Sequence, residues 1–161
     1  MKYKISPITT LDELYRSKGA PTGNVIVDAF VEYLMHSNSR KAQDAALCLG
    51  VETRWLSESL RIFIGMNLSD AILEWRMRKA LDLMDDEQLS LEEIAHRCSY
   101  SQFNHFAEAF QKRWGVSPYT YRTGEEPTNA LYDCNKSAKT RRELFERIQA
   151  LKNRNNPAPT E

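Results

Sequence analysis

The sequence predicts an all-α protein, and three observations lead to this fold class. Apolar residues recur at three- and four-residue steps along most of the chain, as in helices that are buried on one face. No segment shows the strict alternation of a half-buried strand. A pattern of small and apolar residues in the middle of the chain occurs twice, about 50 residues apart. With 161 residues, of which 42% are hydrophobic, the chain is long enough for one packed domain.

Composition excludes several classes of protein. Lys plus Arg and Asp plus Glu both number 22, so a nucleic-acid partner has to be argued from local residues and not from net charge. No stretch approaches the roughly 18 uncharged apolar residues of a membrane span, and no signal peptide is evident. We therefore expect a cytoplasmic protein without membrane contact. Cys48, Cys98 and Cys134 lack metal-ligand spacing, so we expect no metal and no cofactor.

The first 24 residues are expected to form an arm, because they have little periodicity and several turn formers: Pro7, Gly19, Pro21 and Gly23. A helix that is buried on one face should follow from Val25 to about Ser37.

The first pair of helices is expected at about 39–65. A short helix over 39–49 ends at Gly50, where a left-handed residue is wanted, and a second helix follows over about 53–64. The longest uninterrupted helical pattern covers 68–84 and is interpreted as a linker helix.

The second pair of helices is expected at about 90–115. Ser90 and Glu93 have the spacing of a capping box, which predicts that a helix begins at Leu91. Ser101 is positioned to cap the next helix, which should continue to Trp114.

A short helix at Pro118 closes a domain of residues 25–122, and 123–161 are expected to form a loop, a helix over 138–152 and a disordered tail. The apolar edge of the helix over 138–152 consists of Leu144, Phe145, Ile148 and Leu151. Residues 136–161 carry seven basic and three acidic side chains. Two interpretations remain open: this extension turns its charge toward a DNA backbone, or it is a capping helix with a solvated face.

The two pairs match with an offset of 49 residues before the turn and 50 after it, since the second copy has one extra turn residue: Ala46, Gly50, Leu56, Leu60 and Gly65 correspond to Ala95, Ser99, Phe106, Phe110 and Gly115. A short helix, a tight turn and a second helix make a helix-turn-helix, whose second helix enters the DNA major groove. A linker helix of 17 residues is about 26 Å long. It can therefore hold two such second helices about one DNA turn, roughly 34 Å, apart on one side of a duplex.

The second pair also carries a family signature, made up of Ile94-Ala95, Tyr100-Ser101, Asn104-His105-Phe106, the run 109–118 and Tyr121-Arg122. Matching residues upstream are Gly50, Leu56, Gly65, Arg76-Met77, Ala80 and Leu83-Met84. This pattern resembles the AraC family of bacterial transcription regulators. The resemblance implies a double helix-turn-helix domain that binds promoter DNA and regulates transcription, usually as an activator that contacts RNA polymerase.

Most members of this family also carry a ligand-binding or signalling domain. Here 24 residues precede the first expected domain helix. The chain therefore resembles the minority that are stand-alone DNA-binding domains, and we expect no small-molecule effector within it. A fragment of a longer regulator would have the same sequence.

Outward-facing residues on the second helix of each pair are the candidates for reading DNA. Arg54 can bond both guanine acceptors in the major groove. The resemblance implies base contacts at the positions of Arg54, Ser57 and Glu58. Arg61 lies one turn further along and is expected at a phosphate.

On the second unit, the expected base-reading residues are Asn104, which suits adenine, together with His105 and Glu108. Ser101 and Gln102 are expected to position a phosphate at the start of the helix, where backbone donors are exposed. Further phosphate candidates are Lys112, Arg113 and Arg122.

Three residues depart from the family pattern. Glu58 and Glu108 stand where arginine is common, and Ser99 replaces the usual turn glycine. A glutamate can accept a hydrogen bond from cytosine but repels phosphates, whereas Ser99 should fit the turn with modest strain if its φ stays negative. The alternative function is therefore a protein-interaction adaptor of the same fold that has lost DNA binding. No catalytic motif is evident, so we expect no enzyme activity.

Overall fold

The computed structural model describes residues 9–124 and 138–154, and within these ranges all regular structure is helical, which confirms the predicted fold class. The helices are α1 (Leu11–Arg16), α2 (Val25–His36), α3 (Ala42–Leu49), α4 (Thr53–Ile64), α5 (Leu68–Met84), α6 (Leu91–Arg97), α7 (Phe103–Trp114), α8 (Pro118–Thr123) and α9 (Ala138–Lys152). Among them, none is both long and apolar enough to span a membrane.

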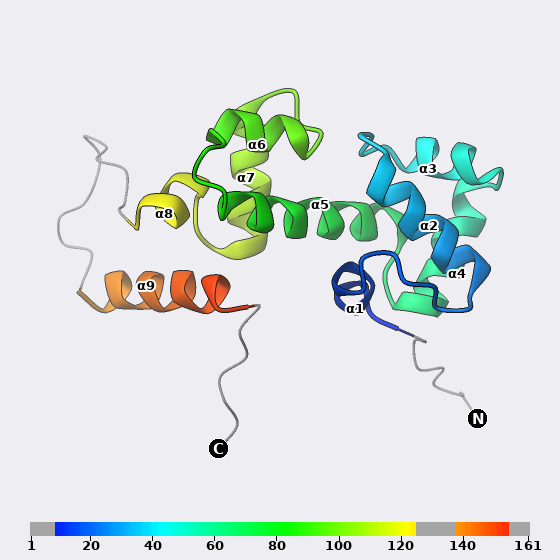
Figure 1. Ribbon diagram of the computed structural model, residues 1–161, viewed down its shortest axis with the longest axis horizontal. Helices are drawn as coiled ribbons and strands as arrows, with labels where there is room; N and C mark the ends of the chain where they lie inside the picture. The colour runs from blue at the N-terminus through cyan, green and yellow to red at the C-terminus, as the bar shows by residue number, and fades with distance from the viewer. Residues whose placement is uncertain (1–8, 125–137, 155–161) are drawn as a thin grey trace, which may run out of the picture.

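The long helix α5 runs through the middle of the molecule, with α2, α3 and α4 around one end and α6, α7 and α8 around the other (Figure 1). Its buried side chains divide between two apolar clusters. Leu68 and Ile72 pack with the helices at the N-terminal end and belong to the first cluster. Leu81 and Met84 pack with the helices at the C-terminal end and belong to the second cluster. A single helix therefore connects the two helix-turn-helix units and contributes to both cores. The first unit contains α3 and α4, and the second contains α6 and α7.

The two units have the same turn geometry. In the first unit the amide of Val51 donates to the carbonyl of Ala46, and in the second the amide of Tyr100 donates to the carbonyl of Ala95, both at 3.0 Å. Gly50 and Ser99 both have a φ of 70°. The condition set for modest strain at Ser99, a negative φ, is therefore not met, because this hydrogen-bonded turn requires a left-handed residue in both copies.

Helix α6 begins with the predicted capping box, in which the Ser90 hydroxyl accepts from the Glu93 amide and the Glu93 carboxylate accepts from the Ser90 amide, both at 3.1 Å. Ser101, by contrast, does not cap α7. Gln102 is the N-cap residue, and its side chain makes no capping hydrogen bond.

Arg76 fixes the first unit to α5. This side chain is fully buried, and its guanidinium donates to the carbonyls of Leu34, Ser37 and Ser39 at 3.3, 2.5 and 3.2 Å. Burial lowers the pKa of Arg76. The arginine thereby satisfies carbonyls at the end of α2 and in the loop that leads to α3.

The expectation that the N-terminal segment is only an arm is wrong, because it contains helix α1. The Thr10 hydroxyl accepts from the Glu13 amide at 3.2 Å and caps the helix. Leu11 and Leu14 are buried in the first cluster, and the ring of Tyr15 packs edge-on against Trp75 of α5. These tertiary contacts stabilise a helix too short to form alone.

Helix α9 docks on the second unit. Ile148 is 3% exposed, and Leu144 and Leu151 are partly buried beside it. Phe145 is 59% exposed, so its predicted place on the docking edge is wrong. The helical period explains this, because Ile148 and Leu151 lie four and seven residues from Leu144 and share its face. The expected loop and tail lie mostly in 125–137 and 155–161, outside the described residues.

Candidate nucleic-acid interface

Helix α4 presents a polar face opposite its buried face. Leu56, Leu60 and Ile64 are buried in the first cluster. Arg54 and Glu58 are exposed and form an ion pair, with 3.2 Å between Arg54 Nε and Glu58 Oε1 and side chains 84% and 60% exposed. Such an exposed pair is weak, so the guanidinium remains available to a DNA base.

The other predicted residues on α4 differ in their surroundings. Arg61 is exposed in the last turn of the helix. Ser57 is half-buried, and its hydroxyl accepts from the amide of Leu68 at 3.2 Å, which ties α4 to the start of α5. Trp55, which was not predicted, is 46% exposed beside Arg54. The sequence places this large aromatic residue in the first turn of the helix, and that position was the signal that could have marked Trp55 as a candidate for DNA contact.

Helix α7 repeats this arrangement in the second unit. Phe106, Phe110 and Trp114 are buried in the second cluster. The predicted base-reading residues Asn104, His105 and Glu108 are all exposed, as is Lys112. A groove between α7 and α5 is lined by His105, Glu108 and Lys112 from one side and by Leu73 from the other.

Both recognition helices begin without a side-chain cap. Glu52 precedes α4 and Gln102 precedes α7, and neither side chain accepts from the first turn. By contrast, the Asn67, Ser90 and Ser117 side chains cap α5, α6 and α8. The amides of the first turns of α4 and α7 therefore remain available to an anion such as a phosphate.

Two predicted phosphate contacts have partners inside the protein. The Arg113 guanidinium donates to both carboxylate oxygens of Glu74 at 2.6 and 2.7 Å and lies 4.0 Å from the centroid of the Trp114 ring. The hydrogen bond to Glu74 raises the pKa of Arg113. Arg122 donates to the carbonyls of Leu89, Met84 and Asp86, at the end of α5 and in the loop after it.

A basic hollow lies between the two units, and its cationic residues were not predicted. Lys79 of α5 and Arg97 of α6 line it, together with His96, Asn38 and Ser101. Burial lowers the pKa of Lys79, with contributions from Arg76 and Arg97. Ser101 lies just before α7, so the hollow opens on the side where this recognition helix begins.

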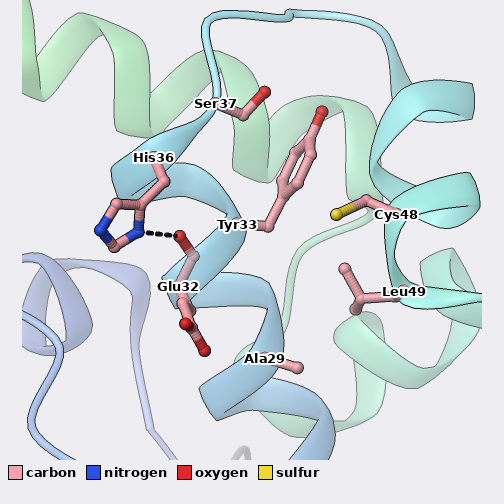
Figure 2. A pocket seen from close by; sticks show the side chains of 7 residues that line it. All are labelled: Ala29, Glu32, Tyr33, His36, Ser37, Cys48 and Leu49. Carbon is pink, nitrogen blue, oxygen red and sulfur yellow. Dashed lines mark hydrogen bonds between the residues drawn. The ribbon is translucent and has the colours of Figure 1, made fainter.

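A second hollow, between α2 and α3, holds a cysteine and a histidine that do not form a catalytic pair. Figure 2 shows His36 turned away from Cys48, with its Nδ1 hydrogen-bonded to the carbonyl of Glu32 at 2.9 Å. Nucleophilic catalysis needs the histidine within hydrogen-bond reach of the thiol.

Comparison with known proteins gives consistent matches. A family model described as a helix-turn-helix domain matches residues 45–124. The Msm operon regulatory protein of Streptococcus mutans is 27% identical over 95 residues, which are 57% of this chain and 34% of that protein. The transcriptional activator RhaS of Escherichia coli is 30% identical over 73 residues, 45% of this chain and 26% of its own length. The chain thus spans about a third or less of these curated relatives.

Solved structures match as well. The C-terminal domain of AraT, a response regulator from Geobacillus stearothermophilus, is 25% identical with a TM-score of 0.55, and the match covers 83% of this chain and 98% of that domain. A DNA-binding transcriptional dual regulator from Escherichia coli K-12 shares the fold at 21% identity and a TM-score of 0.53, over 66% of this chain and 100% of that one.

Proposed function

The chain belongs to the AraC family of helix-turn-helix transcription regulators, and on this premise we propose that it binds double-stranded promoter DNA with both of its units. One chain reads two adjacent segments of the major groove, with α4 in one and α7 in the next. The family is one of DNA-binding regulators and not a class of enzymes.

The observation that carries this proposal is the repeated unit itself. Both copies have the same turn hydrogen bond, a buried apolar face and an exposed polar face on the second helix. Both second helices also begin with free amides, which suit phosphates at the edges of a groove.

The proposed base contacts are Arg54 and Glu58 on α4 and Asn104, His105 and Glu108 on α7. Ser57 remains a candidate through its hydroxyl proton, because its oxygen accepts from Leu68 and its O–H is still a donor. Phosphates would lie at Arg61, Ser101, Gln102 and Lys112, with Lys79 and Arg97 facing the backbone between the two grooves.

We also propose that DNA binding by this chain activates transcription, with RNA polymerase as the protein partner. The support is the relative RhaS, which is described as a transcriptional activator. A promoter fused to a reporter gene, with and without the chain, measures the direction of regulation.

Selection of bound sequences from a random duplex pool, followed by affinity titration, tests the DNA-binding proposal. Arg54→Ala and Asn104→Ala should each weaken binding to the selected site by about 1–3 kcal/mol and relax the base preference at one position. Arg142→Ala, which removes an exposed cation from α9, is the control and should leave site preference unchanged. Recovery of no common motif would contradict the proposal and favour an adaptor function.

A further inference from the structure

Arg40 joins the two helix-turn-helix units directly. It lies in the loop before α3, and its Nε donates to the carbonyl of Ser99 in the turn of the second unit at 2.8 Å. Its guanidinium also stacks on the ring of Tyr100, 3.8 Å from the ring centroid. Figure 1 shows the loop before α3 and the turn after α6 facing each other across the space beside α5.

The base from which Arg40 extends is itself fixed. The carbonyls of Ser37 and Ser39, just before Arg40 in the chain, accept hydrogen bonds from the buried Arg76 of α5. Tyr100, the surface on which the guanidinium lies, is buried in the second cluster and packs edge-on against Phe106. Both ends of the Arg40 contact are therefore anchored in the two cores.

This contact changes the mechanics of the molecule. The other links between the units are made along α5, where Tyr15 of α1 bonds Asp82 and Arg113 of α7 bonds Glu74, so bending or twisting of this helix would alter the separation of α4 and α7. Arg40 adds a connection that does not pass through α5, because it joins the loop before α3 to the turn after α6. A direct connection of this kind resists rotation of one unit against the other about α5.

We propose that Arg40 is a positioning residue that sets the relative orientation of α4 and α7, and hence the spacing of the two DNA segments that the chain accepts. This inference rests on the proposed DNA-binding function. A cation at this place would otherwise be taken for a phosphate contact. Its Nε and one face of its guanidinium are, however, already engaged by Ser99 and Tyr100.

The first experiment needs no DNA. Nitroxide labels at the exposed Cys48 and at Gln111→Cys report the separation of the two units by pulsed electron resonance, with Cys134→Ser in the background. Cys98 should stay unlabelled, because burial raises the pKa of its thiol to about 11. We expect one narrow distance distribution in the parent protein and a broader one with Arg40→Ala. An equally narrow distribution with Arg40→Ala would overturn the proposal.

The second experiment compares the selected DNA site with the same site carrying one extra base pair between its halves. Arg40→Ala should reduce the preference for the original spacing by about three- to tenfold, while affinity for an isolated half-site stays unchanged. Arg40→Lys should restore the preference only in part, because one ammonium group cannot donate to Ser99 and stack a planar face on Tyr100 at the same time.

Lys41→Ala is the matched control, because it removes an exposed charge one residue away. It should leave the spacing preference unchanged. If Arg40→Ala instead weakens both spacings equally, lowers the salt dependence and is rescued by lysine, Arg40 is a phosphate contact and the proposal is wrong. If the chain binds no DNA, the proposed function fails, while the distance measurement still decides whether Arg40 holds the units.

Discussion

Ser99 is a serine in the backbone conformation that the matching turn of the first unit gives to Gly50. Its φ of 70° lies in the left-handed region, and its hydroxyl oxygen is buried without a hydrogen-bond partner. Left-handed backbone costs an ordinary L-residue roughly 1–2 kcal/mol, and a buried unpaired hydroxyl adds to that cost. The second turn is therefore the strained copy of the repeat.

We expect Ser99→Gly to stabilise the protein by about 1 kcal/mol, because glycine adopts this conformation without strain and removes the unpaired hydroxyl. The carbonyl that accepts from Arg40 is kept. Urea denaturation followed by circular dichroism measures the change. Ser101→Gly, at an exposed residue with negative φ, should be neutral or slightly destabilising. A loss of stability with Ser99→Gly would show that the serine contributes a contact of its own.

At this scale the sequence predicts which face a residue occupies better than which partner it has. Helical period placed Asn104 and Glu108 on the exposed face of α7, where the structure has them. The same reasoning predicted that Arg113 and Arg122 contact DNA phosphates. Their partners are Glu74, 39 residues away in the chain, and backbone carbonyls 33 to 38 residues away. Such pairings depend on the tertiary packing of α5, which local pattern does not encode.

Among the elements, α9 stabilises the second unit and lies away from the proposed reading surface. A Cβ on Gly115 would meet the guanidinium of Arg147, so α9 lies at the C-terminal end of α7. Asn104 is eleven residues earlier in the helix, about 16 Å along its axis. Recognition helices contact bases with their N-terminal residues. We therefore favour the capping interpretation of this helix over a DNA-backbone contact.

Ile148→Ala and Phe145→Ala form a matched pair that tests this docking. Ile148 is 3% exposed in the second cluster, so its truncation should cost about 2–4 kcal/mol of unfolding free energy. Phe145 is 59% exposed, so its truncation should cost well under 1 kcal/mol. Thermal and urea denaturation of both variants give the comparison. Equal costs for the two would mean that α9 does not dock as the structure has it.

Helix α1 shows why an element can be missed. It has six residues, and turn-forming residues surround it in the chain. Isolated helices of this length are unstable. Its stability comes from Leu11, Leu14 and Tyr15 packing on α5, and from an ion pair between Asp12 and Arg78. The longer helices, by contrast, contain enough apolar residues at helical spacing to be predicted from the sequence alone.

In the whole molecule, α1 and the residues just after α9 meet at one carboxylate on α5. The Tyr15 hydroxyl donates to Asp82 at 2.5 Å, and Arg154 donates to the other oxygen of Asp82 at 2.8 Å. Burial and the hydrogen bond to Asp82 raise the pKa of Tyr15, so it remains a donor across the physiological range. In Figure 1, α1 and α9 lie along the same side of α5. Both extensions thus brace the helix that connects the two units.

A braced connection between two complete units predicts that one chain suffices for a full DNA site. Sedimentation of the protein with its selected duplex should give a complex of one chain per duplex. Hydroxyl-radical footprinting should give two protected patches on one face of the DNA, about 10 base pairs apart, because α4 and α7 would enter successive turns of the major groove. An added 5 base pairs between the patches should turn the second half-site to the opposite face and leave one patch protected. A complex of two chains per site would mean that the units act in separate molecules. Protection of both patches after the insertion would mean that the units move independently about α5.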